Sequence, residues 1–286
     1  MAPGSIFPDS VHSATVYPAS GSVVNPHDGV ELSYTSKGHG PPLLMVHGSA
    51  LSKAIWRGFG YTKVLSAHYR VITMDLRGHG RSGKPLAEAA YGMDRMAADV
   101  LAVLDDAGVA AAHYVGYSVG ARLGFALAAA APARMLSFTS LAGTYKIPAG
   151  SIGELFFADY DHALEAGGMP GFVAGWEARI GKPLDAMTRA AFLANDAPAL
   201  LAYFRRTDRS EPVDEAVLAA LDLPTLLMAG TRDPRRLEDS RRAAELIPGA
   251  QLVGLPGRDH GNTLFPADEV LAAVVPFLQR AVRART

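Results

Sequence analysis

Segments with strand patterns alternate with segments of helical spacing along most of the chain, and this alternation restricts the fold more than any other feature. Strands are expected at Val30–Ser36, Leu43–Val46, Tyr69–Met74, Tyr114–Val115, Met135–Leu141 and Thr225–Met228. Helices are expected at Met93–Ala107, Val119–Ala131, Leu237–Ile247 and Ala267–Arg283. Strands that are apolar on both faces are typical of a parallel sheet covered by helices. We therefore predict an α/β fold with a mostly parallel central sheet flanked by helices.

The alternation stops between Lys146 and Leu221, where no strand pattern is found. This segment contains many aromatic residues, namely Phe156, Phe157, Tyr160, Phe172, Trp176, Phe192, Tyr203 and Phe204. We predict a helical lid or cap insertion at 146–221, which divides the core into 26–145 and 222–286. Most buried aromatic side chains serve packing, and that is one interpretation of this set. The other is that they line a substrate pocket on the inner face of the lid.

Composition narrows the classes of partner. Lys and Arg total 27 against 28 for Asp and Glu, so nothing indicates nucleic acid or an anionic membrane as a partner. The longest apolar stretch, Leu123–Ala133, is too short to span a bilayer, so no stable membrane insertion is expected. Residues 1–25 are expected to form a loose N-terminal arm without a signal-peptide pattern. With no cysteine in the chain, a cytoplasmic protein is predicted, and no pattern points to an oligomeric state.

The pentapeptide Gly116-Tyr117-Ser118-Val119-Gly120 lies where the strand Tyr114–Val115 ends and an alanine-rich helix begins. A Gly-x-Ser-x-Gly sequence at such a junction forms a tight turn that projects the serine hydroxyl from the edge of the sheet. The backbone amide of Val119, at the helix N-terminus, would face the same space and stabilise negative charge there. The alternative is a plain loop in which Ser118 only caps the helix. The strand before it and the helix after it favour a nucleophilic Ser118.

Three further parts of the sequence extend this pattern. His47-Gly48-Ser49-Ala50 follows the strand Leu43–Val46, the segment Asp75–Ser82 follows the next strand, and two titratable residues, Asp233 and His260, lie in late loops. With the pentapeptide, these segments make the chain resemble the α/β-hydrolase superfamily from about residue 28 to its end. The resemblance implies the fold of that family, a serine–histidine–acid triad and a lid inserted between strands.

A serine hydroxyl needs a base to remove its proton, and His260 is the candidate among 9 histidines. It lies in a turn-rich loop before the last helix, from which a side chain can reach back over the strand ends. In the order serine, acid, histidine, Asp233 follows the strand Thr225–Met228 and would accept a hydrogen bond from His260 Nδ1. Asp259 is the rival acid, although a side chain adjacent to the histidine rarely meets that nitrogen. The loop after Met135–Leu141 offers no carboxylate.

The resemblance also implies an oxyanion hole made by the backbone amides of Val119 and Ser49, with Ala50 as the alternative to Ser49. The predicted reaction is hydrolysis of a small carboxylic ester or lactone through an acyl-enzyme on Ser118. It needs a small-molecule acyl substrate, no cofactor and no metal. Related dehalogenases and epoxide hydrolases use a carboxylate nucleophile, which Ser118 disfavours. Lyase, acyltransferase or perhydrolase chemistry on the same triad, or a non-catalytic binding protein of the same fold, remain alternatives.

Two nucleotide-binding patterns compete for the loop after the strand Tyr69–Met74. The segment Gly78–Gly83 matches G-x-G-x-x-G, but it follows at least two strands, whereas the dinucleotide fingerprint normally opens the first β-α-β unit. It also nearly matches a phosphate-binding P-loop, but Pro85 replaces the hydroxyl residue that would bind Mg²⁺. A metal at Asp75 and His79 would lack further obvious ligands. We interpret this loop as scaffold beside the active site.

Overall fold

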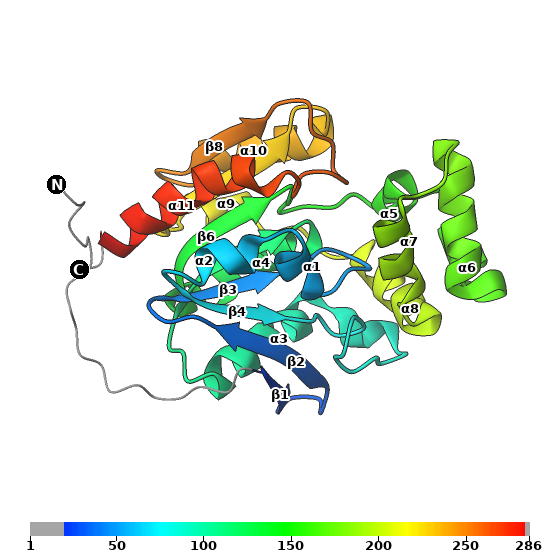
Figure 1. Ribbon diagram of the computed structural model, residues 1–286, viewed down its shortest axis with the longest axis horizontal. Helices are drawn as coiled ribbons and strands as arrows, with labels where there is room; N and C mark the ends of the chain where they lie inside the picture. Colours follow the sequence, from blue (N-terminus) through cyan, green and yellow to red (C-terminus); the bar gives the residue numbers. More distant parts are fainter. Residues whose placement is uncertain (1–19, 284–286) are drawn as a thin grey trace.

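The computed structural model describes residues 20–283 as one sheet with helices around it (Figure 1). The strands are β1 (Ser20–Val24), β2 (Glu31–Lys37), β3 (Pro42–Val46), β4 (Arg70–Met74), β5 (Ala112–Tyr117), β6 (Met135–Leu141), β7 (Thr225–Gly230) and β8 (Gln251–Leu255). Their order in the sheet is β1-β2-β4-β3-β5-β6-β7-β8. The β1–β2 and β2–β4 pairs are antiparallel, and all other pairs are parallel. The predicted α/β fold with a mostly parallel sheet is therefore confirmed.

Helices cover both faces of the sheet. One buried cluster joins the strands to α1 (Ala54–Gly58), α2 (Tyr61–Leu65) and α11 (Ala267–Arg283). The other joins them to α3 (Met93–Asp106), α4 (Val119–Ala130) and α10 (Pro234–Leu246). Short 3₁₀ helices lie at Glu88–Tyr91 and Pro132–Arg134. Four of these helices, α3, α4, α10 and α11, lie where helical spacing predicts them.

The strand β3 shows why central strands are apolar throughout. Leu44 and Val46 belong to one buried cluster, whereas Leu43 and Met45 belong to the other. Successive side chains of a strand point to opposite faces, so a strand between two layers of helices must bury both sets. The result is a rigid centre that fixes the positions of the loops at the strand ends.

Two edge strands were not expected from the sequence. The predicted arm 1–25 needs correction at its end, because Ser20–Val24 forms β1 and pairs with β2; residues 1–19 lie outside the described residues. At the other edge, β8 pairs with β7. Both strands have several exposed residues, apolar ones such as Val24 and Leu252 among them, since an edge strand contacts the core less than a central strand does. They therefore lack the apolar pattern that reveals the inner strands.

Between β6 and β7 the chain forms the helices α5 (Ser151–Leu155), α6 (Tyr160–Ile180), α7 (Ala186–Leu193), α8 (Ala197–Thr207) and α9 (Glu215–Ala219). Figure 1 shows α5 to α8 grouped at the end of the sheet to which β3, β4 and β6 point. Their aromatic side chains pack against one another: the Phe156 ring lies 5.1 Å from that of Trp176 and 5.2 Å from that of Phe172. For this set the packing interpretation holds.

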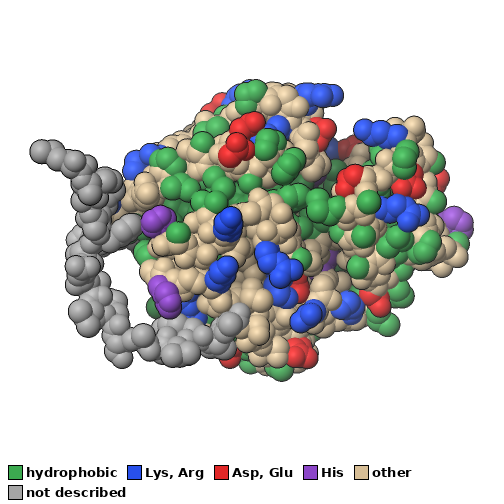
Figure 2. Space-filling view, viewed as in Figure 1, with side chains coloured by type: hydrophobic (Ala, Val, Ile, Leu, Met, Phe, Trp, Pro, Cys, Tyr) green, Lys and Arg blue, Asp and Glu red, His purple; other side chains and the backbone are tan. Residues whose placement is uncertain are grey.

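Figure 2 shows acidic and basic side chains spread over one face, with hydrophobic side chains between them across its middle. Within residues 20–283, no helix combines the length and the apolar character that crossing a bilayer requires.

Candidate active site

Ser118 occupies a strained turn between β5 and α4. Its backbone has φ 55° and ψ −115°, a conformation that residues other than glycine rarely adopt. The flanking glycines make the turn possible. A Cβ on Gly116 would lie 2.4 Å from the carbonyl carbon of Gly120, and one on Gly120 would lie 2.4 Å from the carbonyl oxygen of Val46. The predicted strand–turn–helix junction is thus present, with Ser118 at its apex.

The structure brings the three predicted triad residues together. Ser118 Oγ lies 2.9 Å from His260 Nε2, and His260 Nδ1 lies 2.9 Å from Asp233 Oδ2. The carboxylate can only accept, so Nδ1–H donates to it and Nε2 is left to accept the Ser118 proton. The rival acid Asp259 instead accepts a hydrogen bond from the backbone amide of Asn262, at 3.1 Å. The geometry therefore favours Asp233 over Asp259.

Asp233 uses its two carboxylate oxygens for different partners. While Oδ2 bonds to His260, Oδ1 accepts from the backbone amide of Arg236 at 3.4 Å and caps α10. Burial acts to raise the pKa of the Asp233 carboxyl, but the hydrogen bond from His260 and the charges of His260 and Arg236 outweigh it. The pKa of Asp233 therefore lies below its ordinary value, and the group is ionised at neutral pH.

Neighbouring side chains hold the His260 loop in place. The Tyr117 hydroxyl donates to the backbone carbonyl of His260 at 2.7 Å, and the two rings stack with centroids 5.8 Å apart. The buried Arg258 guanidinium donates to the carbonyls of Thr263 and Pro266, at 2.9 and 2.8 Å. Sequence reasoning missed both residues. Tyr117 could have been noticed because it lies inside the Gly-x-Ser-x-Gly pentapeptide.

The loop after β3 is fixed by the buried ring of His47. Its Nδ1–H donates to the Gly48 carbonyl at 2.7 Å, and Nε2 accepts from the Leu76 amide at 3.1 Å. Burial lowers the pKa of His47, which keeps the ring neutral and suited to these two roles. Gly48 lies close beside the nucleophile, since a Cβ there would lie 2.9 Å from Cδ1 of Tyr117 and 3.2 Å from the Cβ of Ser118.

The two predicted oxyanion-hole residues, Ser49 and Val119, line the same cavity as Ser118. Val119 begins α4, where backbone amides have no partner within the helix. The Ser49 hydroxyl is hydrogen-bonded at 2.7 Å to the hydroxyl of Tyr203, a fully buried residue of α8. This bond links the loop after β3 to the helices between β6 and β7, and it sets Tyr203 apart from the other aromatic residues there.

The loop after β4 is bound firmly into the scaffold. Asp75 accepts from the backbone amides of Lys53 and Arg81, at 2.7 and 3.0 Å, and forms an ion pair with the Lys53 ammonium. The buried Arg77 guanidinium makes two hydrogen bonds of 2.6 Å to Asp99. The His79 ring donates to the Arg77 carbonyl at 2.9 Å. Among residues 20–283, no group of three or more His, Cys, Asp or Glu side chains is placed to hold a metal ion.

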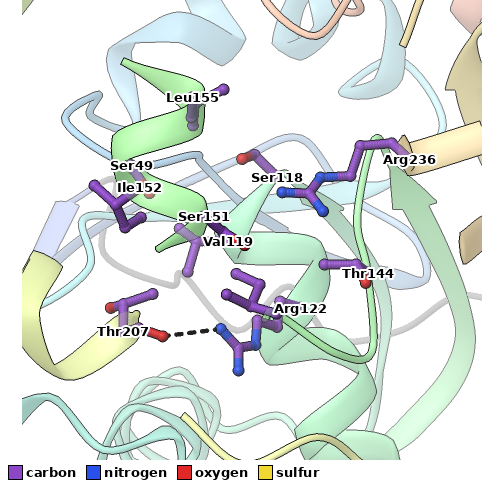
Figure 3. A pocket seen from close by; sticks show the side chains of 11 residues that line it. Ser49, Ser118, Val119, Arg122, Thr144, Ser151, Ile152, Leu155, Thr207 and Arg236 are labelled. Carbon is purple, nitrogen blue, oxygen red and sulfur yellow. Dashed lines mark hydrogen bonds between the residues drawn. The ribbon is translucent and has the colours of Figure 1, made fainter. Parts of the chain in front are cut away.

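A cavity opens beside Ser118 (Figure 3). Its lining residues come from the loop after β3, from α4, α5, α8 and α10, and from the segment after β6. They are Ser49, Ser118, Val119, Arg122, Thr144, Ile147, Ser151, Ile152, Leu155, Thr207 and Arg236. The wall is thus made of hydroxyl and aliphatic side chains with two arginines. Arg122 and Arg236 were not singled out by sequence reasoning, although Arg122 lies one helical turn after Ser118 in an otherwise apolar helix.

Comparisons with known proteins agree with this fold. The family model of the alpha/beta hydrolase fold matches residues 41–197. A rhodomycin D methylesterase of Streptomyces peucetius is 38% identical, covering 85% of this chain and 94% of its own. The structure of a hydrolase from Pseudomonas aeruginosa superposes with a TM-score of 0.76 at 28% identity, over 90% of this chain and 97% of that one. An enol-lactonase from Burkholderia xenovorans gives 0.75 at 24% identity, over 88% and 98%. The chain belongs to the α/β-hydrolase family.

Proposed function

We propose that the protein hydrolyses a small carboxylic ester or lactone through an acyl-enzyme on Ser118. The observation that carries the proposal is the continuous chain of hydrogen bonds from Ser118 through His260 to Asp233, which opens onto a cavity. A relative with 38% sequence identity is a methylesterase, which supports an ester as the substrate. This chain is an ester-acting hydrolase of the α/β-hydrolase family.

The first half of the reaction forms the acyl-enzyme. Ser118 Oγ attacks the carbonyl carbon of the ester while His260 Nε2 takes its proton. The Asp233 carboxylate stabilises the imidazolium that forms. The negative charge on the former carbonyl oxygen is received by the amides of Val119 and Ser49. The tetrahedral species then collapses, and His260 gives its proton to the leaving alkoxide, which departs as the alcohol.

The second half returns the enzyme to its starting state. A water molecule attacks the acyl carbonyl and transfers a proton to His260 Nε2. The same two amides hold the second oxyanion. Its collapse breaks the bond to Ser118 Oγ, which regains the proton from His260, and the carboxylic acid is released. Every proton moves between His260 Nε2 and either Ser118 Oγ or the oxygen that occupies the position of the leaving alcohol.

The helices between β6 and β7 serve as the lid of this site. Ile152 and Leu155 of α5 and Thr207 of α8 reach the cavity beside Ser118, so part of its wall comes from this insertion. A wall built in this way excludes water and selects the shape of the substrate. In this role the insertion at 146–221 sets specificity, while the core performs the chemistry.

Replacing Ser118 tests the proposal directly. Ser118→Ala is expected to lower kcat for p-nitrophenyl acetate by at least about 10³-fold, because no nucleophile remains. A fluorophosphonate should label the wild-type protein at Ser118 and leave the variant unlabelled. Ser66→Ala, at the end of α2 and outside the cavity lining, is the matched control. A Ser118→Ala variant with wild-type turnover would overturn the proposal.

A further inference from the structure

The cavity beside Ser118 contains two buried positive charges. Arg122 comes from α4 and is 2% exposed, and Arg236 comes from α10 and is 9% exposed. Figure 3 shows the Arg236 guanidinium extending toward Ser118, whereas the Arg122 guanidinium is turned toward Thr207. None of the other lining residues carries a charge. Two cations in a largely buried wall without a lining carboxylate make an unusual environment for a neutral ester.

The partners of Arg122 do not neutralise its charge. Its Nη1 and Nη2 donate to the backbone carbonyls of Thr207 and Ser210, both at 3.2 Å. These carbonyls lie at and after the C-terminal end of α8, where the helix dipole offers only partial negative charge. Burial lowers the pKa of the Arg122 guanidinium to about 10, so the group stays positive at neutral pH. Arg122 also has a structural role, because it holds α8 against α4.

Arg236 has capacity for a further partner. Its Nη1 is buried and forms an ion pair with Asp239 Oδ2 at 3.6 Å, but it makes no hydrogen bond among the described residues. Asp233, the other carboxylate close to it in sequence, is already engaged by His260 and by the backbone of α10. A buried charged donor without a hydrogen bond is costly, and most such groups in proteins are hydrogen-bonded. A ligand that brings an anion would remove this cost.

We propose that the cavity selects esters that carry a carboxylate close to the scissile bond, held by Arg122 and Arg236. This inference rests on the proposed function and names its substrate class. A carboxylate fits because its two oxygens match the paired donors of a guanidinium group. The aliphatic side chains of Ile152 and Leu155, in the same wall, would contact the hydrocarbon part of such a substrate.

Matched pairs of substrates test the selectivity. Phenyl hydrogen glutarate and phenyl valerate differ only in a terminal carboxylate on the acyl side, and 3-acetoxybenzoate and 3-methylphenyl acetate place the same contrast on the alcohol side. After subtraction of spontaneous hydrolysis, the carboxylate member of at least one pair should have a kcat/KM higher by about tenfold to a hundredfold, the range of a charge-assisted hydrogen bond. Equal values, or a preference for the neutral member in both pairs, would overturn the proposal.

Substitutions of the arginines test whether these residues cause the preference for the carboxylate substrate. Arg236→Met should bring the ratio within a pair close to one, and Arg236→Lys should retain part of it. Arg241→Met removes a charge on the exposed side of the same helix and should leave the ratio unchanged. Arg122→Met should act like Arg236→Met if it folds. Arg236→Met carries the test by itself, and an unchanged ratio in that variant would refute the role of Arg236.

A binding measurement separates this inference from the proposed function. Calorimetry of Ser118→Ala with phenyl hydrogen glutarate and phenyl valerate reports affinity without turnover, and Arg236→Met in that background should remove the difference. If wild-type protein hydrolyses both esters equally through Ser118, the carboxylate site is wrong and the esterase proposal stands. If no ester is hydrolysed, the esterase proposal fails, and the calorimetric difference alone supports or overturns the carboxylate site.

Discussion

Replacing Asp233 separates two roles that one side chain performs. Oδ2 holds His260 as the tautomer whose Nε2 can accept a proton, and Oδ1 caps α10. In Asp233→Asn the amide nitrogen replaces Oδ2, and the ring is then favoured as the tautomer with its proton on Nε2, which cannot accept from Ser118. By comparison with the same change in serine protease triads, kcat should fall by about 10⁴-fold. Asp233→Ala should lose a similar factor.

The two variants should differ in thermal stability, although their loss of activity is similar. Asparagine keeps an oxygen for the Arg236 amide, and alanine does not. Helix caps contribute about 0.5–2 kcal/mol, and the 3.4 Å length of this bond places it at the lower end. Asp233→Ala should therefore unfold about 1–2 °C below Asp233→Asn in a chain of this size. Ester hydrolysis and thermal melting of both variants are the assays. An active Asp233→Asn protein, or an Asp233→Ala protein that melts above it, would refute this reasoning.

Two further changes test the surroundings of the site. Tyr203→Phe removes the hydrogen bond to the Ser49 hydroxyl and should lower kcat by about fivefold with little change in KM, from a bond of about 1 kcal/mol; a changed KM with constant kcat would contradict this. His79→Asn should flatten the acid dependence of stability. Burial lowers the folded-state pKa of His79 to about 3. Below about pH 6.5 the unfolded chain binds a proton that the folded chain does not, so the wild type loses stability as the pH falls towards 3 and keeps it above 6.5. Between pH 7 and 5, His79 should lower the free energy of unfolding of the wild type, measured with urea, by roughly 2 kcal/mol. An equal decrease in the variant would disprove the assignment.

The sequence allows the inner parts of the fold to be predicted, because burial on both faces produces a clear pattern. The last helix, Ala267–Arg283, has the bounds that its apolar spacing predicts. The edge strands β1 and β8 were not predicted, because many of their residues are exposed and no regular pattern of buried apolar residues marks them. The positions of Ser118, Asp233 and His260 could be inferred from their order and from the loops that hold them. The contacts between them needed the structure.

The charged part of the cavity could not be predicted for a different reason. Arg236 becomes a neighbour of Ser118 only when α10 packs beside β7. Arg122 lies one helical turn after Ser118, but neither arginine belongs to a recognisable motif. An arginine in a helix is usually a solvent-exposed residue, so its burial is a tertiary effect. Tyr203 escaped for the same reason, since it is one of many aromatic residues in its segment and only the fold brings it to Ser49.

The path of the chain between β6 and β7 has a consequence for protein engineering. These strands are parallel, hydrogen-bonded neighbours, so the segment from residue 142 to 224 leaves the sheet at the C-terminal end of β6 and crosses back to the N-terminal end of β7 without another strand between them. An equivalent segment from another member of the family could therefore be grafted without changing the strand order. Such a chimera would need to retain two contacts, Ser49 with Tyr203 and Arg122 with the end of α8. Exchanging this segment would then change the range of substrates while Ser118 and the rest of the core stay the same.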